Sequence, residues 1–320
     1  MKPLPVFDDV SKAANRIQPY IHRTPILTSK TLNKMTNAAL FLKAENFQRI
    51  GAFKARGACN AVFALSEDEA RCGVATHSSG NHAQAIALAA GLRGIPAIVV
   101  MPEDAPPVKV AAVKNYGAEI VWAGSNPRDR EHILKTVLER TGPADCRPVF
   151  IHPSNNFHVI AGQGTATVEL LEEVPDLDIV MTPVGGGGLL AGTALSAKAL
   201  SSHIRVIGAE PAAVDDAARS LRDGYIHPPT NAHTIADGLR TFLGDMSFPI
   251  IREHVSDIVT VSEGAIVAAM RLVWERMKII IEPSAAVPVA ALFEHPDVFR
   301  GQRVGVILSG GNVDLDHLPW

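Results

Sequence analysis

From Gly73 onward, short apolar segments of strand type alternate with segments of helix type. This alternation is typical of right-handed β-α-β units, which build parallel sheets covered by helices on both faces. The sequence therefore predicts an α/β fold of doubly wound parallel sheets. The expected strands cover residues 40–43, 74–77, 97–101, 119–122, 149–151, 179–183, 204–209, 258–261 and 304–308, and the expected helices cover 54–65, 82–92, 108–116, 129–140, 165–173, a segment after Gly188 that ends at Leu200, 212–222, 264–277 and 284–293.

The length of the chain, 320 residues, suggests about two domains. No linker separates two blocks of sequence, so one domain is expected to be inserted in the other. Residues 67–150 are predicted to form a small domain, and residues 1–66 and 151–320 a larger one. The middle of the segment 17–39 is expected to be a loop, because Thr24-Pro25 disfavours a helix before it.

Composition excludes several classes of protein. The formal net charge is −3 and no basic stripe is visible, which argues against a nucleic-acid partner. No apolar run approaches the ~20 residues of a membrane span, and Asp8 and Asp9 interrupt any signal-peptide core at the start. Cys59, Cys72 and Cys146 have no metal-finger or CxxC spacing. Reduced thiols in a cytoplasmic protein are therefore expected.

The stretch GAFKARG (51–57) places Lys54 between small residues and beside Phe53, where a helical pattern begins. A surface lysine needs no such setting, because water serves its charge best. A lysine that forms a Schiff base must be neutral, and a partly desolvated pocket favours the neutral amine. An ordinary lysine at a helix start explains this stretch about as well when it is considered alone.

Four consecutive glycines, Gly185, Gly186, Gly187 and Gly188, follow a predicted strand and open a predicted helix. Backbone N–H groups there can converge on a phosphate, and the helix N-terminus favours the negative charge. A simple turn needs only one glycine. The rival interpretation is a dinucleotide fold, because Gly186, Gly188 and Ala191 fit G-x-G-x-x-A and Glu210 follows ~20 residues later. This half of the chain would thus also suit a nicotinamide-dependent oxidoreductase.

Two further polar turns follow predicted strands. The sequence SSGNH (78–82) gathers hydroxyls and backbone donors at a carboxyl strand end, where doubly wound sheets bind ligands. It suits a substrate carboxylate, and a capped helix start is the alternative. The sequence SGGN (309–312) follows the last strand, where a plain glycine turn is equally consistent. Glu210 and Asp216 flank a short loop that suits Mg²⁺ or Ca²⁺, or simply caps the next helix.

Seven stretches together resemble the fold-type II (tryptophan synthase β-like) pyridoxal-phosphate enzymes, and serine racemase and the serine/threonine dehydratases in particular. The resemblance runs through nearly the whole chain, and the order of the motifs makes it specific. The dehydrogenase interpretation gives no task to Lys54, Ser79 or Ser309. The stretches are GAFKARG (51–57), SSGNH (78–82), IAGQGT (160–165), PVGGGG (183–188), TIADG (234–238), IEPS (281–284) and LSGGNVDL (308–315).

The resemblance implies a role for each site residue. The cofactor is pyridoxal 5'-phosphate, and an active site between the two domains is implied. The substrate carboxylate is expected at Ser78, Ser79, Gly80, Asn81 and His82. For the cofactor, Lys54 forms the Schiff base, Phe53 packs near the ring, Asn81 binds the ring hydroxyl, residues 185–188 bind the phosphate, Ser309 faces the ring nitrogen and Glu282 lies in the pocket wall. For the metal, Glu210, Asp216 and the Val214 carbonyl match a divalent-ion site for Mg²⁺, or for Ca²⁺ or Mn²⁺.

The implied activity is a dehydratase, or ammonia-lyase, that converts a β-hydroxy-α-amino acid to a 2-oxo acid and ammonia. The cofactor acidifies the Cα proton, Lys54 is the base, and a hydroxyl at the ring nitrogen favours β-elimination over transamination. A catabolic role is expected because no regulatory domain follows residue 315. The resemblance also implies a homodimer.

The substrate is left open between serine or threonine, 3-hydroxyaspartate and an arylserine. Ser79 stands where racemases carry their second acid/base, so an amino-acid racemase that uses Lys54 and Ser79 is the alternative. Ser154 stands where racemases have asparagine. Phe242 replaces a serine of the racemases and favours a hydrophobic β-substituent. Arg130 aligns with an arginine that can pair with an acidic side chain, or it is a solvated helix residue.

Overall fold

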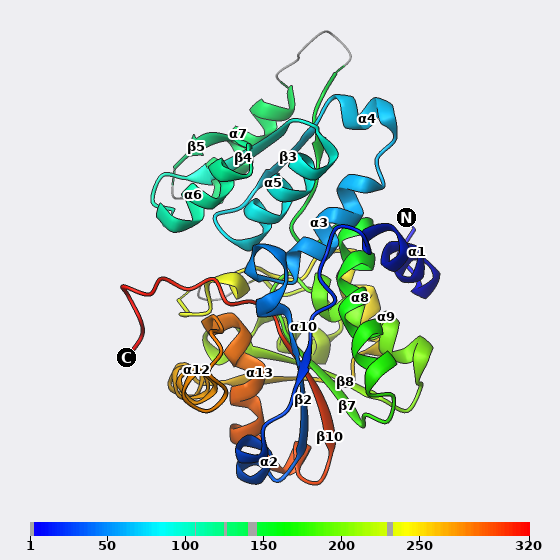
Figure 1. The fold of residues 1–320 in the computed structure, drawn as a ribbon, viewed down its shortest axis with the longest axis vertical. Helices are drawn as coiled ribbons and strands as arrows, with labels where there is room; N and C mark the ends of the chain where they lie inside the picture. The colour runs from blue at the N-terminus through cyan, green and yellow to red at the C-terminus, as the bar shows by residue number, and fades with distance from the viewer. Residues whose placement is uncertain (1–2, 106, 125–126, 140–145, 229–232) are drawn as a thin grey trace.

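The computed structural model of the protein describes residues 3–105, 107–124, 127–139, 146–228 and 233–320. These residues form two sheets, one above the other in Figure 1. All neighbouring strands run parallel except β1, which is antiparallel to β2. The larger sheet has the strand order β1 (Ile26–Leu27), β2 (Ala39–Ala44), β10 (Arg303–Leu308), β7 (Ile179–Pro183), β8 (Arg205–Pro211) and β9 (Asp257–Val261), and the smaller has β5 (Glu119–Ala123), β4 (Ala97–Pro102), β3 (Val74–His77) and β6 (Val149–Phe150).

Helices cover both faces of the six-stranded sheet, as parallel strands buried on both sides require. The core on one face contains residues of α2 (Lys30–Thr36), α12 (Glu263–Met277), α13 (Pro283–Glu294) and α14 (Pro296–Phe299). The core on the other face contains residues of α1 (Phe7–Ile17), α8 (Phe157–Glu173), α9 (Gly188–Leu200), α10 (Asp216–Asp223) and α11 (Ser247–His254). Figure 1 shows α12 and α13 on one side of the strands and α8 and α9 on the other.

The four-stranded sheet is covered in the same way. The core on one face joins it to α3 (Lys54–Phe63), α5 (Asn81–Arg93) and α6 (Pro107–Asn115). The other face packs against α7 (Pro127–Glu139), and α4 (Glu67–Arg71) precedes β3. All four strands come from residues 74–150, which agrees with an inserted unit, while the predicted boundaries at 66/67 and 150/151 stay predictions.

The predicted fold class and most elements are confirmed. The strands β3 and β7 have the predicted bounds, and the other predicted strands differ by one or two residues at an end. The helices α1, α2, α4, α11 and α14 were not predicted. In α2 the reason is the short apolar pattern: only Leu32 and Thr36 are buried, and Asn37 ends the helix in the left-handed conformation with φ 52°.

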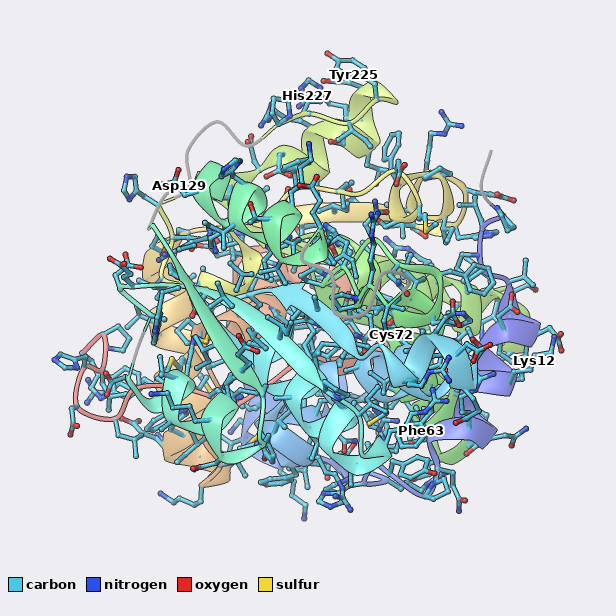
Figure 2. All side chains as sticks on the ribbon, turned by 90° about the horizontal axis from the view of Figure 1, so that it is seen from above. Lys12, Phe63, Cys72, Asp129, Tyr225 and His227 are labelled. Atoms are coloured by element: carbon cyan, nitrogen blue, oxygen red, sulfur yellow. A yellow bond between two sulfur atoms is a disulfide. The ribbon has the colours of Figure 1, made fainter. Side chains whose placement is uncertain are left out.

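The prediction of reduced cysteines is wrong for two of the three. Cys72, labelled in Figure 2, forms a disulfide with Cys146, 74 residues later in the chain. Only Cys59 is free, and it is buried. Sequence spacing could not reveal this pair, because the approach of the two residues depends on β3 and β6 lying side by side. None of the described helices is long and apolar enough to cross a membrane.

Candidate active site

Lys54 begins α3, and its amine points toward a carbonyl of a distant segment. Lys54 Nζ donates a hydrogen bond of 2.7 Å to the carbonyl of Pro153 and lies 5.1 Å from the centre of the Phe53 ring. Burial lowers the pKa of Lys54 to about 8, although the negative charge of Glu282 opposes the shift. A lysine with this pKa is largely neutral at mildly alkaline pH, which is the form that a nucleophile or a base requires.

The helix that carries Lys54 is held by buried ion pairs. Arg56, with 0% of its side chain exposed, donates to Glu45 and to Glu169, and Glu169 also accepts from Lys43. These residues come from α3, β2, α8 and the turn after β2. Removal of one partner from such a buried pair costs about 3–5 kcal/mol. The ion pairs therefore hold the start of α3 against α8 and against the turn after β2.

The glycine loop (residues 185–188) runs from β7 into α9. Gly187 has φ +79°, which favours glycine. A Cβ atom at Gly188 would lie 2.8 Å from the Ser154 carbonyl oxygen, and one at Gly186 would lie 2.1 Å from Ser154 Oγ. The first N–H groups of α9 have no partner within the helix, and no side chain caps them. The loop thus has no room for side chains and can offer these N–H groups to an anion, and Ser154 links it to Pro153 and the Lys54 amine.

The serine loop (residues 78–81) runs from β3 into α5. The Gly80 N–H donates to Ser78 Oγ at 3.1 Å. Asn81 Nδ2 donates to Glu282 Oε1 at 2.8 Å, and Asn312 Nδ2 donates to Asn81 Oδ1 at 2.9 Å. This chain of bonds joins α5 to the segments that follow β10 and precede α13, and so brings the serine loop to the carboxyl end of the larger sheet.

The turn after β10 completes the site. Ser309 is 2% exposed, and its carbonyl accepts a hydrogen bond of 3.0 Å from the Phe53 N–H. Gly310 pairs with Ala52 and accepts from the Glu282 N–H at 3.0 Å. Burial raises the pKa of Glu282 to about 7, and Asp237 adds to the effect. One cluster therefore gathers a lysine of lowered pKa, an anion-binding turn, a hydroxyl-rich turn and a buried serine.

This geometry agrees with a comparison with protein families. Residues 17–310 match the model of the family described as "Pyridoxal-phosphate dependent enzyme". The chain belongs to this family. The match covers Lys54, both loops and Ser309, so the predicted family and fold class are confirmed. When bound, pyridoxal phosphate supplies an electron sink for carbanions.

Relatives of the protein in this family share about half of its residues. A "beta-hydroxyaspartate dehydratase" of Paracoccus denitrificans is 50% identical over 99% of both chains. An "L-threo-3-hydroxyaspartate ammonia-lyase" of Saccharomyces cerevisiae is 49% identical over 98% of this chain and 94% of the relative. The crystal structure of serine racemase from Dictyostelium discoideum has 48% identity and a TM-score of 0.91, over 97% of this chain and 99% of that chain. The predicted reaction classes agree with these names.

The residues present fit pyridoxal phosphate. The glycine loop leaves no room for side chains where a phosphate would approach the backbone, and its helix N-terminus favours a dianion. Lys54 has the lowered pKa that a Schiff base requires. The dinucleotide alternative does not fit, because Glu210 accepts hydrogen bonds from the N–H groups of Ala217 and Ala218 at 3.3 and 2.7 Å. Its carboxylate is therefore engaged away from the position that a ribose would need.

Two predicted substrate contacts, His82 and Phe242, have different surroundings in the structure. His82 is 2% exposed, and its Nε2 contacts the carbonyl of Ile151 at 3.2 Å. Its ring therefore contacts the segment directly after β6, and burial, followed by the charge of nearby Lys54, lowers the pKa of His82. Phe242 is 55% exposed, whereas Thr241 Oγ1 would lie 3.1 Å from a Cβ at Gly185. Thr241 is exposed as well, and its hydroxyl is the group of this pair that approaches Gly185.

The predicted metal ligands lie close together in the chain and are buried. Glu210, at the end of β8, and Asp216, at the start of α10, are each 2% exposed, and Val214 lies between them in the turn Ala212–Val214. Asp216 Oδ2 is buried without a hydrogen-bond partner. Among the described residues, no three His, Cys, Asp or Glu side chains form a group able to hold a metal. The predicted site has two carboxylates and a backbone carbonyl, and the unpartnered Asp216 oxygen fits a cation.

Sequence reasoning missed three contributors. Pro153 supplies the carbonyl for Lys54, Asn312 orients Asn81, and Lys109 forms an ion pair with Asp237 beside the serine loop. The motif positions of Asn312 and Asp237 were visible, but their partners lie 231 and 128 residues away in the chain. Only the relative placement of the two sheets reveals such pairs.

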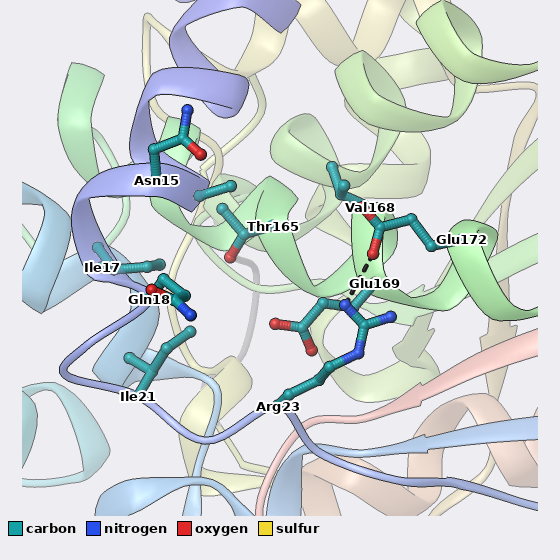
Figure 3. A pocket seen from close by; sticks show the side chains of 10 residues that line it. Asn15, Ile17, Gln18, Ile21, Arg23, Thr165, Val168, Glu169 and Glu172 are labelled. Carbon is teal, nitrogen blue, oxygen red and sulfur yellow. Dashed lines mark hydrogen bonds and ion pairs between the residues drawn. The ribbon is translucent and has the colours of Figure 1, made fainter.

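A separate cavity lies away from this site. It measures about 350 Å³ and lies between α1 and α8 (Figure 3). Arg23 and Glu172 both line it and form an ion pair, with Nη1 2.7 Å from Oε2. None of the predicted site residues lines it.

Proposed function

We propose that the protein is a pyridoxal-phosphate-dependent ammonia-lyase that converts a β-hydroxy-α-amino acid to a 2-oxo acid and ammonia. The observation that carries the proposal is the Lys54 amine, with its pKa lowered to about 8, within 2.7 Å of the carbonyl that precedes Ser154 and the glycine loop. Among the substrates left open, we propose 3-hydroxyaspartate. Relatives named for this substrate are 48–50% identical to the protein, and serine racemases are 46–49% identical. Sequence identity alone therefore does not distinguish 3-hydroxyaspartate from serine as the substrate.

Arg130 supports an acidic substrate. It lies on α7 and is half-buried, and its Nε atom is buried without a hydrogen-bond partner in the described part of the chain. A buried donor left unpaired costs about 1–3 kcal/mol. A second carboxylate of the substrate would satisfy the guanidinium with a charge-assisted, bidentate contact. Serine and threonine offer no such group.

The side chains divide the work around the bound amino acid. Lys54, in its neutral form, takes the proton from Cα. The N–H groups of the glycine loop bind the phosphate, and Ser309 presents a hydroxyl to the ring nitrogen. Ser78, Ser79 and Gly80 bind the α-carboxylate at the N-terminus of α5. Asn81, which is oriented by Glu282 and Asn312, would bind the ring hydroxyl.

A substrate panel tests the proposal. The purified protein is assayed with serine, threonine, 3-hydroxyaspartate and phenylserine for 2-oxo acid and for the opposite enantiomer. We expect 3-hydroxyaspartate to give the highest kcat/KM. Borohydride should bleach the visible absorbance and attach the cofactor to the Lys54 peptide, and Lys54→Ala should prevent both. Failure to form 2-oxo acid from all four compounds contradicts the proposal.

The contribution of Arg130 can be isolated with a matched pair of variants. We expect Arg130→Met to lower kcat/KM for 3-hydroxyaspartate about 100-fold, because a charge-assisted bidentate contact contributes about 3 kcal/mol. The same variant should change kcat/KM for threonine less than threefold. Arg71→Met, at an exposed arginine of α4, is the control. Equal losses with both substrates would exclude a contact to the acidic side chain.

A racemase is the second candidate, because Ser79 is a half-buried hydroxyl in the serine loop and serine racemases are among the relatives. Inversion at Cα requires a second proton donor on the face opposite to Lys54. Ser79→Ala should then abolish racemisation and leave elimination within about threefold of the wild-type rate. Parallel losses of the two activities would remove Ser79 from this role.

The finer predictions on metal, assembly and location also belong to the proposal. The buried pair Glu210 and Asp216 supports a divalent cation, and Mg²⁺, Ca²⁺ and Mn²⁺ should each be tested by calorimetric titration. A homodimer is supported by the exposed Phe47 (46%) and Ile280 (44%), whose segments meet where Asn46 Nδ2 donates to the Ile280 carbonyl at 3.0 Å. Light scattering tests it. A cytoplasmic location stays a prediction, which fractionation of cells tests.

A further inference from the structure

One ion pair ties the cover of the smaller sheet to the active-site side of the larger one. Lys109 Nζ, on α6, lies 2.5 Å from Asp237 Oδ2 in the turn η4 (Asp237–Leu239). The helix α6 packs on the four-stranded sheet, and η4 belongs to the part of the chain that surrounds the six-stranded sheet. The pair therefore crosses between the two halves of the molecule.

Lys109 approaches the serine loop, and the two residues that follow Asp237 approach the glycine loop. Lys109 Nζ is the atom nearest to Gly80 in the serine loop, 3.9 Å from where its Cβ would lie. In η4, the Leu239 Cα and the Gly238 carbonyl oxygen lie 3.0 and 3.2 Å from the corresponding point of Gly185 in the glycine loop. The ion pair thus joins a residue beside the serine loop to a turn that contacts the glycine loop.

Stability alone does not account for this arrangement. The Asp237 side chain is 44% exposed, and ion pairs with an exposed partner contribute about 0–1 kcal/mol. The Lys109 side chain is only 11% exposed, although lysines usually extend their amines to water. The neighbour Lys114, on the same helix, is exposed. Lys109 is turned inward to a contact that is present only when the two halves are close together.

We propose that Lys109 and Asp237 form a latch that holds the four-stranded half closed over the site, which makes Lys109 a positioning residue for the serine loop. Substrate must enter between the two loops, so the latch opens for entry and closes over the bound amino acid. The open form does not bind substrate well, and the apparent affinity scales with the closed fraction. The inference deepens the proposed function and rests on it only for the kinetic readout.

The test combines kinetics with hydrogen–deuterium exchange on the cofactor-loaded protein. Lys109→Met and Asp237→Asn should each raise KM five- to tenfold and change kcat less than twofold. In both variants, amides of α6, the serine loop and η4 should exchange about fivefold faster in the absence of substrate, with no change in the strands of either sheet. Lys114→Met is the control and should change neither quantity.

Two combined variants separate a latch from independent effects. The double variant Lys109→Met with Asp237→Asn should be no worse than either single variant. The charge swap Lys109→Asp with Asp237→Lys should recover most of the lost affinity and protection. Additive losses, or a swap that recovers nothing, would overturn the latch.

Two further outcomes are decisive. If Lys109→Met raises KM for 3-hydroxyaspartate but not for threonine, and Asp237→Asn changes neither, then Lys109 contacts the substrate side chain and the latch is wrong. If no amino acid releases ammonia, the proposed function fails, and the latch is then tested by hydrogen–deuterium exchange alone. The loop amides must then exchange faster in both single variants, or the latch is also wrong.

Discussion

The glycine loop and the serine loop have the same architecture and opposite packing. Each runs from the carboxyl end of a parallel strand into a helix. In the glycine loop a Cβ at any of the four positions would lie within 3.0 Å of another atom. In the serine loop the atom nearest to a Cβ at Gly80 is 3.9 Å away. A turn that holds a permanent cofactor can be packed tightly, whereas a turn that receives and releases a substrate needs space to move.

The largest expected effect is the loss of cofactor affinity when a methyl group is added to the glycine loop, compared with the same change in the serine loop. Gly188→Ala places Cβ 2.8 Å from the Ser154 carbonyl oxygen, which is backbone and cannot move aside. Overpacking of about 3 kcal/mol should lower cofactor affinity about 100-fold, measured by titration of the cofactor-free protein with pyridoxal phosphate. Gly80→Ala, the matched variant, should lower it less than threefold. Similar losses in both variants would break the comparison.

The next effect concerns the acids behind the glycine loop. β8 carries Glu210, and the Val184 N–H, next to the loop, donates to Ala209. Burial raises the pKa of Glu210 to about 8, and burial raises that of Asp216 to about 6. The cation-free native state therefore holds a proton on Glu210 up to about pH 8, whereas the unfolded chain loses it near its ordinary value of 4.5. The stabilisation is complete below pH 4.5 and is lost as pH rises through 8.

A decrease of ~2 kcal/mol in the free energy of unfolding is expected between pH 5 and pH 8, once partial hydration is allowed for. Mg²⁺ at pH 8 should restore the stability, because a cation replaces the lost proton, and it should have little effect at pH 5. Urea denaturation at both pH values measures this. Glu210→Gln should remove most of the pH dependence, leaving the smaller contribution of Asp216, and should abolish the response to Mg²⁺. A response unchanged in that variant would place the cation elsewhere.

The smallest effect distinguishes two adjacent residues beside the glycine loop. Thr241→Val removes a hydroxyl near Gly185 and should lower cofactor affinity about fivefold, the magnitude of one hydrogen bond. Phe242→Ser should change affinity and the ratio of kcat/KM between phenylserine and threonine less than twofold, since Phe242 is 55% exposed. A loss of preference for phenylserine in Phe242→Ser would restore the sequence-based assignment of this residue to the pocket.

The sequence predicts features that depend on local patterns and does not predict contacts between distant parts of the chain. The strands β3 and β7 and the turns after them were predictable, because each is a local pattern of apolar residues followed by glycine or serine. The bond from Lys54 to Pro153 spans 99 residues, and that from Asn81 to Glu282 spans 201, so local patterns do not contain them. The orientations of His82 and Phe242 depend on which neighbour each ring meets, and no motif records that.

The disulfide between Cys72 and Cys146 has a consequence for the modularity of the protein. The two Cα atoms are 5.1 Å apart, although 74 residues separate them, so this portion of the chain leaves and returns at almost one point. A short turn can therefore join the two ends when this portion is removed, but its removal also exposes the apolar residues of α3 that pack against it.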